Sequence, residues 1–269
     1  MAARLTTPNK AKIARRVIEV LDFFDEHHRD ATVMDIVRRY GRPQSSTSEL
    51  LSSLVELGLL RKDRLSRSYS LTPRAALLGT GGQSAAVRDG RLVRLLDRLS
   101  AQTRLPVALF GMNGLSAQIY AWRPGSRSPG RDLTRTVGGM QHPLAHSAAG
   151  WLLLSTLAQP RRDLLLRRLN AEASDNQKFS CAEIAARIAA CEHSGEVRGP
   201  AGFGSTADMV AMLIPCEVAD EALAVAVICG RDEPVNRDSI AECLGDALRQ
   251  MLGDQEPPAG VVRLVTTAA

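Results

Sequence analysis

Aromatic residues are scarce in this sequence, making up 4% of its 269 residues, although 45% of the residues are hydrophobic. The hydrophobic cores must therefore consist mainly of aliphatic side chains. No apolar run reaches the roughly 18 residues that a membrane-spanning helix requires, so no membrane partner is expected. Residues 1–12 are polar and basic and lack the apolar stretch of a secretory signal, which predicts a cytoplasmic protein.

Motifs of common catalytic and cofactor sites are missing as well. The sequence contains no G-x-S-x-G, P-loop or H-E-x-x-H pattern. The glycine-rich residues 199–204 lack the preceding strand and the acidic partner of a dinucleotide site. We therefore expect no enzyme and no cofactor, with a small-molecule hydrolase on the C-terminal part as the alternative.

Cysteine and histidine spacing argues against a metal site. The five cysteines form no CxxC pair, which favours reduced thiols over a disulfide or zinc framework; they are Cys181, Cys191, Cys216, Cys229 and Cys243. His142 and His146 have the i, i+4 spacing of a helical metal pair. Pro143 lies between them, and no nearby carboxylate or thiol completes a ligand set, so we expect no bound metal.

Positive charge is concentrated in the first quarter of the chain. The whole sequence has 34 Lys and Arg against 29 Asp and Glu, and residues 1–74 contain 14 and 9 of these. The remaining residues contain 20 of each sign and are neutral. A chain of this length suits two compact domains, so the distribution predicts a small basic domain that binds a polyanion, followed by a larger neutral domain.

The pattern of residues 10–74 is typical of a winged helix-turn-helix. Apolar residues at helical spacing predict three helices, at 11–26, 32–40 and 45–57. Two short strands, at 59–62 and 68–71, then flank a polar, basic turn. Such a domain places the N-terminal residues of its third helix in the major groove of DNA, while the hairpin, or wing, contacts phosphates.

Helix-capping residues support these boundaries. Thr32 and Asp35 have the spacing of a capping box, and Gly41 follows as a stop. Ser46 and Glu49 have the same spacing at the start of the third helix. Glu49 therefore has two interpretations: it either closes this capping box or accepts a hydrogen bond from a cytosine and so reads the DNA sequence.

The candidate DNA-contacting residues follow from this arrangement. The third helix and the turn before it contribute Arg42, Gln44, Ser45, Ser46, Ser48 and Glu49. The wing contributes Arg61, Lys62, Arg64 and Arg67, whose charges would neutralise phosphates. The alternatives are that the wing is merely a solvated hairpin, or that a degenerate winged helix serves a protein-interaction adaptor.

The residues after 74 predict a hinge and a mixed domain. The hinge contains three glycines and covers 75–84, and one helix is expected from 85 to 104. Asn113-Gly114 lies between two apolar runs and predicts a hairpin over 107–122. Further helices are expected at 147–157, 160–172, 181–192 and 236–252, and a second pair of strands at 209–215 and 222–230. An antiparallel sheet with helices around it is an α+β architecture.

Two stretches resemble the IclR family of transcription regulators. Between Gly41 and Gly79, the similarity lies in the helix start Pro43-Gln44-Ser45-Ser46, the turn Glu56-Leu57-Gly58 and the wing exit from Tyr69 to Arg74. Residues 137–150 (VGGMQHPLAHSAAG) resemble the segment that leads into a helix of the family's effector domain. One departure is Glu49, because a basic residue is common at that position in the family.

The resemblance covers roughly residues 10 to 252 and implies both architecture and function. It implies a flexible arm at 1–9, a winged helix-turn-helix at 10–74, a hinge and linker helix at 75–104, a GAF-like or profilin-like effector domain at 105–254 and a tail at 255–269. The implied function is a regulator that binds a palindromic DNA operator as a homodimer or higher oligomer. Its effector would be a small organic acid.

The resemblance also implies a ligand pocket between the sheet and residues 138–147. The candidate effector residues are His142, His146, Ser147, Ala148, Ala149, Met209, Val227 and Cys229. Where the family's last strand often carries serines, this chain carries Val227 and Cys229, so the pocket is expected to take a larger, mostly apolar or aromatic acid. The alternative is that these residues simply pack the core.

Overall fold

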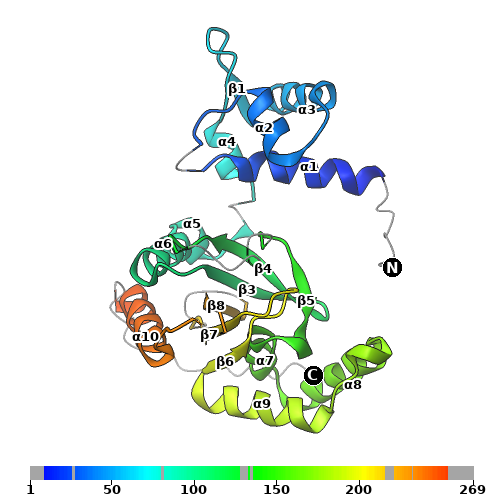
Figure 1. Cartoon of the computed structure of the whole chain (residues 1–269), viewed down its shortest axis with the longest axis vertical. Helices are drawn as coiled ribbons and strands as arrows, with labels where there is room; N and C mark the ends of the chain where they lie inside the picture. The colour runs from blue at the N-terminus through cyan, green and yellow to red at the C-terminus, as the bar shows by residue number, and fades with distance from the viewer. Residues whose placement is uncertain are drawn as a thin grey trace. The chain divides into compact units, whose positions relative to one another are not determined.

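The computed structural model describes residues 9–25, 28–79, 82–127, 133, 136–215, 221–231 and 233–253. The chain divides into two compact units, Met1–Gln83 and Ser84–Ala269, which we describe separately (Figure 1). Cys216 and the expected tail lie outside the described residues, as does all but Asn9 of the expected arm. Residues 85–104, which the sequence assigned to a linker, fall within the second unit.

The first unit is a winged helix-turn-helix. In chain order it contains α1 (Asn9–Phe23), α2 (Val33–Tyr40), α3 (Gln44–Glu56), β1 (Leu60–Lys62), β2 (Tyr69–Leu71) and α4 (Pro73–Leu77). Strands β1 and β2 pair antiparallel and form the wing. The core is mainly aliphatic, as the scarcity of aromatic residues predicted, although Phe23 and Tyr69 are also buried in it.

The turn between α2 and α3 follows from local residue chemistry. Helix α2 begins at a capping box in which Thr32 Oγ1 accepts from the Asp35 N–H at 3.4 Å, and Asp35 Oδ2 accepts from the Thr32 N–H at 2.8 Å. Gly41 adopts a left-handed conformation, with φ of +61°, and its N–H donates to the Val37 carbonyl. The predicted start and stop of this helix are confirmed.

The predicted capping box at the start of α3 is wrong. Pro43, with φ of −60°, is the residue that precedes the helix, so α3 starts at Gln44 and Ser46 lies inside its first turn. The Ser46 hydroxyl donates to the Pro43 carbonyl at 3.2 Å instead of capping the helix. Glu49 is therefore an exposed residue of the second turn.

The second unit is built on an antiparallel sheet. Over the described residues, its strand order is β5-β4-β3-β8-β7-β6. The strands are β3 (Val107–Asn113), β4 (Ser116–Arg123), β5 (Gln141–Pro143), β6 (Glu196–Pro200), β7 (Asp208–Leu213) and β8 (Leu223–Cys229). The helices are α5 (Ala85–Arg88), α6 (Arg91–Thr103), α7 (Ala148–Ser155), α8 (Gln159–Glu172), α9 (Cys181–Ser194) and α10 (Arg237–Gly253), with 3₁₀ turns η3 (Leu144–His146) and η4 (Asp175–Gln177). The α+β class is confirmed.

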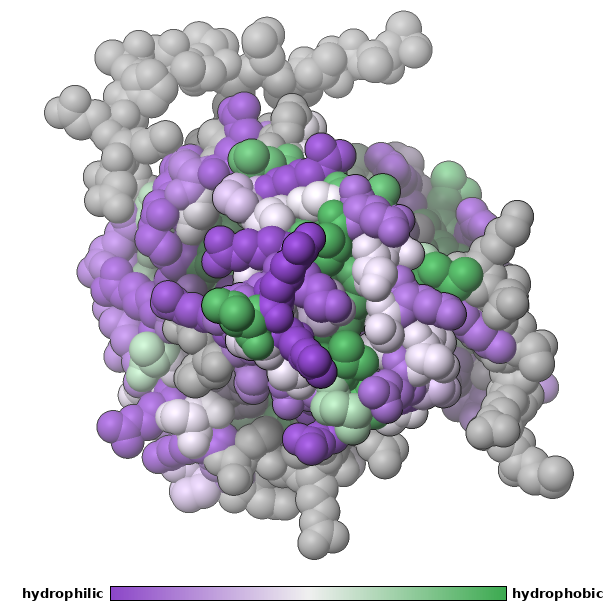
Figure 2. All heavy atoms as spheres, turned by 90° about the horizontal axis from the view of Figure 1, so that it is seen from above, coloured by the Kyte–Doolittle hydropathy of each residue, from purple (hydrophilic) through white to green (hydrophobic). Residues whose placement is uncertain are grey.

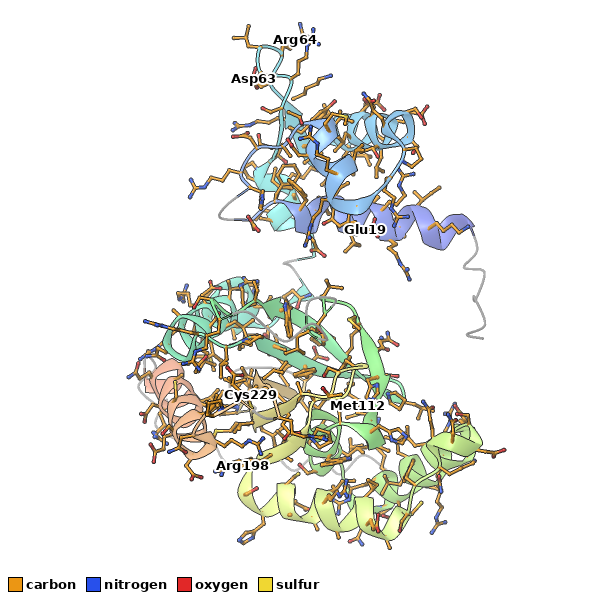
Figure 3. The ribbon with its side chains drawn as sticks, viewed as in Figure 1. Glu19, Asp63, Arg64, Met112, Arg198 and Cys229 are labelled. Atoms are coloured by element: carbon orange, nitrogen blue, oxygen red, sulfur yellow. The ribbon has the colours of Figure 1, made fainter. Side chains whose placement is uncertain are left out.

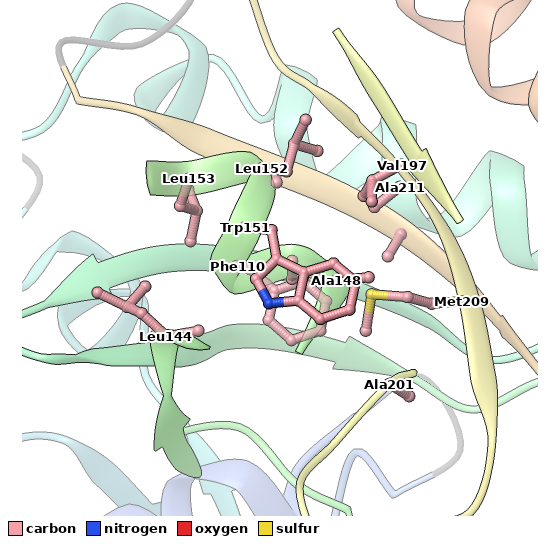
Figure 4. Packing of buried hydrophobic residues seen from close by; sticks show 14 of the residues in the cluster. Phe110, Leu144, Ala148, Trp151, Leu152, Leu153, Val197, Ala201, Met209 and Ala211 are labelled. Carbon is pink, nitrogen blue, oxygen red and sulfur yellow. The ribbon is translucent and has the colours of Figure 1, made fainter. Parts of the chain in front are cut away.

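Strand alternation divides the core of this unit into two layers. On β8, Ala226 and Ile228 belong to the layer that contains α7 and α9. Figure 4 shows Trp151 of α7 in this layer, together with Phe110 of β3. The intervening β8 residue Val227 points to the opposite face, where α6 and α10 pack on the sheet.

The single helix expected over residues 85–104 is in fact two helices. Gly90, with φ of +74°, separates α5 from α6. One side of α6 is buried against the sheet and α10 through Leu92, Leu95, Leu96 and Leu99. Burial of a leucine side chain contributes about 1.5–3 kcal/mol, so these four residues hold α6 within the second unit.

The sheet differs from expectation in one turn and in two strands. Asn113 pairs with Ser116, so the hairpin turn is Gly114-Leu115 rather than Asn113-Gly114. Strands β5 and β6 were not expected, because the first contains Pro143 and the second ends at Pro200. Both are edge strands, where a proline without an N–H is tolerated.

Candidate nucleic-acid interface and ligand site

The start of α3 presents polar side chains to solvent. Gln44, Ser45 and Glu49 are exposed, and Ser48 is half-buried. Figure 2, which draws all heavy atoms of the chain from above, shows a face that is mostly hydrophilic with scattered hydrophobic residues. The polar side chains at the start of α3 include hydrogen-bond donors and acceptors of the kind that read base edges in the major groove.

Arg42 has a different environment from the one expected for a DNA contact. Its guanidinium group donates to both carboxylate oxygens of Glu19 on α1, at 2.8 and 3.1 Å. This ion pair joins the turn before α3 to α1 and partly neutralises the Arg42 charge. Arg42 therefore positions α3 within the domain.

Arg16 of α1 was missed in the sequence analysis. Its guanidinium group donates to Ser46 Oγ at 3.2 Å, which brings a cation of α1 to the start of α3. Residues 15 and 16 form a visible basic pair in the sequence. No local pattern, however, predicts that residue 16 meets residue 46, because this contact depends on how the helices pack.

The strands of the wing hold two cations in defined positions. Arg61 Nε donates to Ser70 Oγ at 2.8 Å. The Lys62 ammonium group lies 5.3 Å from the centre of the Tyr69 ring, within the range of a cation–π contact. The wing is thus a braced hairpin with cationic side chains along it.

The tip of the wing carries further cations on an ordered turn. Asp63 Oδ1 accepts from the N–H groups of Leu65 and Ser66, at 2.7 and 3.3 Å. These backbone hydrogen bonds hold the pKa of Asp63 below its ordinary value. Arg64 and Arg67 are exposed beside this turn, and Figure 3 shows Asp63 and Arg64 at the far end of the hairpin. The tip of the wing therefore presents two exposed cations to solvent.

In the second unit, the two candidate histidines lie in a cluster of aromatic rings. The centres of the His142 and His146 rings, from β5 and η3, are 6.3 Å apart. The Phe203 ring lies 5.2 Å from His142, and the Phe179 ring lies 5.6 Å from His146. These phenylalanines were missed, because they come from loops without a periodic pattern.

The backbone at Gly202 comes unusually close to this cluster. A Cβ atom at Gly202 would lie 2.7 Å from the His142 ring and 3.1 Å from Ser147 Cβ, and the residue has φ of +76°. Glycine at position 202 thus allows the loop that carries Phe203 to lie against β5 and the start of α7. Burial lowers the pKa of His142, so its imidazole is neutral at neutral pH.

The N-terminus of α7 lies beside the same cluster. Ser147 is buried and precedes α7, and its Oγ accepts from the Gly150 N–H at 3.2 Å. Ala148 and Ala149 are the first two residues of the helix and are buried as well. The first N–H groups of a helix favour an anionic group such as a carboxylate.

The candidate residues on the strands do not all face this cluster. Met209 is buried in the layer with α7, as expected. Val227 and Cys229 lie on the other face of the sheet, against α6 and α10, so they cannot line the same pocket. The β8 residues that face α7 are Ala226 and Ile228. The sequence analysis was therefore one residue out of register on β8, and a shift of one residue moves every side chain of a strand to the opposite face of the sheet.

The described residues contain neither a metal-binding cluster nor a membrane-spanning helix. Among them, no group of three or more His, Cys, Asp or Glu side chains is placed to hold a metal ion. Within the same residues, no helix has the length and apolar character needed to cross a bilayer. Cys181, Cys191, Cys229 and Cys243 are free thiols. Burial raises the pKa of Cys191 to about 11, which keeps that thiol protonated.

One family model matches part of the first unit. Residues 14–64 match the family model of the IclR helix-turn-helix domain. The match spans α2, α3 and β1, together with most of α1 and the start of the wing turn. No protein with a curated description matches the chain significantly.

Solved structures of IclR-family proteins share the fold. An IclR homologue from Microbacterium hydrocarbonoxydans, complexed with 4-hydroxybenzoate, is 18% identical with a TM-score of 0.55, and the match covers 90% of this chain and 98% of that one. An IclR transcriptional regulator from Alicyclobacillus acidocaldarius is 18% identical with a TM-score of 0.54, covering 92% and 97%. The effector domain of an IclR regulator from Acinetobacter sp. ADP1 is 20% identical with a TM-score of 0.54, covering 60% and 93%.

Proposed function

We propose that this protein is a ligand-responsive, DNA-binding transcription regulator, because residues 14–64 match the IclR helix-turn-helix model and the chain has the fold of IclR-family regulators. It acts in the cytoplasm and binds a palindromic operator as a dimer or higher oligomer. The observation that carries the proposal is the family-model match of residues 14–64. In the same unit, the polar start of α3 and the cations of the wing are exposed.

The proposed DNA contacts divide into two kinds. Gln44, Ser45, Ser48 and Glu49 meet base edges or phosphates in the major groove, while Ser46 and Arg42 hold the start of α3 in place. The four wing cations Arg61, Lys62, Arg64 and Arg67 contact phosphates. Phosphate contacts supply affinity without sequence preference, and the α3 side chains supply the preference.

The proposed ligand is a small, mostly apolar or aromatic organic acid. Its ring would pack with Phe203, Phe110 and the two histidines, and its carboxylate would meet the N-terminus of α7 near Ser147. Neutral His142 avoids the cost of a buried charge and can donate one hydrogen bond. The 4-hydroxybenzoate complex of the Microbacterium protein is in line with a ligand of this class.

Self-association is proposed on two grounds. A palindromic operator presents two half-sites, which a two-fold dimer reads with two recognition helices. On α1, Ile13 and Ile18 are 57% and 55% exposed, although apolar side chains of this size usually gain from burial. A partner copy would cover such side chains.

A combined binding experiment tests this function. Calorimetry with 4-hydroxybenzoate on the full chain should show binding, and His146→Ala should weaken it while ligand-free operator binding stays intact. Met209→Ser should shift the preference toward smaller, more polar acids, because it removes apolar wall. Ligand binding should change operator affinity measurably. Failure of the wild-type chain to prefer any genomic fragment over random DNA would contradict the regulator itself.

A further inference from the structure

A second candidate binding site lies on the opposite side of the second unit from the ligand site. Helices α6 and α10 pack side by side on the face of the sheet that does not carry α7 (Figure 1). Between them runs a groove of about 700 Å³, which falls within the range of small-molecule sites. Its lining residues are Arg91, Arg94, Leu95, Arg98, Ala247, Arg249, Gln250 and Met251.

The groove combines an apolar floor with cationic walls. Leu95, Ala247 and Met251 are buried and form the floor. Arg91, Arg94 and Arg98 are spaced at i, i+3 and i+7, so they line one side of α6 over about 10 Å. Arg249 adds a fourth guanidinium group from α10. Four arginines therefore surround one apolar strip.

Two of these cations are matched by carboxylates. Arg91 Nε lies 2.7 Å from Asp89 Oδ2, and the Arg91 side chain is only 11% exposed. Arg249 lies 2.5 Å from Asp246 Oδ1. Both pairs are local, because the partners are two and three residues apart in the chain. These pairs neutralise one charge on α6 and one on α10.

The other two cations have no carboxylate partner among the described residues. Arg94 donates to the backbone carbonyl of Asp89 at 2.9 Å, and Arg98 donates to the side-chain carbonyl of Gln250. Neither accepting atom belongs to a charged group, although the Asp89 carboxylate also attracts Arg94 electrostatically. The four arginines of the groove therefore face two carboxylates, Asp89 and Asp246, which leaves an excess of two positive charges. Each guanidinium has five N–H donors in a planar fork, which matches carboxylate and phosphate groups in a bidentate manner.

We propose that the groove between α6 and α10 binds a small molecule that carries at least two negative charges, as phosphate or carboxylate groups, on an apolar body. Arg94 and Arg98 bind the anionic groups, and the strip of Leu95, Ala247 and Met251 receives the apolar part. The site is separate from the proposed acid site near His142, because the sheet lies between the two. It does not depend on the proposed DNA binding.

Calorimetry of the full chain tests the proposal with two probes, inorganic pyrophosphate and citrate, at a constant ionic strength set with sodium chloride. We expect at least one probe to bind with one site per chain. The Arg94→Gln/Arg98→Gln double variant should weaken that binding at least tenfold. A response to pyrophosphate alone indicates a phosphate ligand, and a response to citrate alone indicates a polycarboxylate.

A control variant separates this site from general attraction of anions. Arg161→Gln/Arg167→Gln removes the same charge from exposed positions on α8. It should bind the probes as the wild type does. The proposal is overturned if neither probe binds above the background in sodium chloride, or if both double variants lose affinity equally.

A conservative variant guards against a folding defect. If circular dichroism shows that Arg94→Gln/Arg98→Gln is unfolded, Arg98→Lys serves instead, because it keeps the charge and removes the planar fork. We expect Arg98→Lys to weaken the bound probe several-fold without changing the melting temperature of the free protein. Unchanged affinity in Arg98→Lys and in the matching Arg94→Lys would overturn the proposal.

Discussion

Glu49 is exposed on the second turn of α3 and takes no part in a capping box, because the helix begins at Gln44. Its carboxylate is therefore free to accept a hydrogen bond from the amino group of a cytosine. We predict that Glu49→Gln leaves the melting temperature unchanged and relaxes one operator position by about 1–3 kcal/mol. Selection from randomised operators measures this, and identical selected sequences for both proteins would exclude a base contact.

Gly150 allows η3 and α7 to lie in contact. A Cβ atom at this position would stand 2.0 Å from the Leu144 carbonyl oxygen, and a backbone atom cannot move aside as a flexible side chain can. Gly150→Ala should destabilise the protein by about 1–3 kcal/mol in urea unfolding and weaken acid binding near His146. The matched control is Gly82→Ala, where no atom lies within 4 Å of the added Cβ. Equal stability of the two variants would contradict this close packing.

His142 makes stability depend on pH in a defined direction. Burial holds its pKa below the ordinary value of about 6.5, so below that pH the unfolded chain binds a proton more readily than the folded chain does. The free energy of unfolding should therefore fall as the pH drops below about 6.5 and level off below the folded-state pKa. His142→Gln should remove this part of the slope. Urea unfolding across the pH range measures it, and an unchanged slope in the variant would contradict the prediction.

At the scale of the element, the wing acts through its charge. The turn is held by Asp63, and Arg64 and Arg67 are exposed beside it. Arg64→Ala/Arg67→Ala should weaken binding about equally on all DNA sequences and reduce the salt slope by about 2, since each phosphate contact contributes about one unit. Operator affinity measured over a range of salt concentrations tests this. A loss confined to one operator sequence would instead indicate base contacts by the wing.

The two sides of helix α6 have different roles: one packs in the core and the other lines the proposed anion-binding groove. Its leucines face the sheet and α10, and its arginines line the groove on the outer side. The break at Gly90 separates this packed helix from α5. The packing of α6 thus makes it part of the core of the second unit.

At the scale of the whole molecule, a palindromic operator requires two DNA-binding domains. We predict two chains, or a multiple of two, on each operator, with half-sites about 34–36 Å apart or at multiples of that distance. Sedimentation of the complex gives the number of chains, and footprinting gives the spacing.

Ile13→Ser/Ile18→Ser should lower the stability of this assembly, whereas Leu164→Ser, at another exposed apolar position, should not. A single chain on a single half-site would contradict the dimer.

Much of the first unit is visible in its sequence. The capping box of Thr32 and Asp35, the stop at Gly41 and the polar turn of the wing are local signals, and each acts within a few residues of the chain. Their spacing determines the helix order and the wing, and so the class of domain. The concentration of positive charge in residues 1–74 likewise needs no structure to be recognised.

The remaining features were decided by tertiary structure, because they depend on residues distant in the chain. Arg42 meets Glu19 across the domain, and only this contact shows that Arg42 positions α3. The face of β8 that meets α7 depends on strand register, so Val227 and Cys229, placed from the sequence in the ligand pocket, lie on the other side of the sheet. The groove between α6 and α10 exists only once two helices far apart in the sequence pack together, since no local pattern records which helices become neighbours.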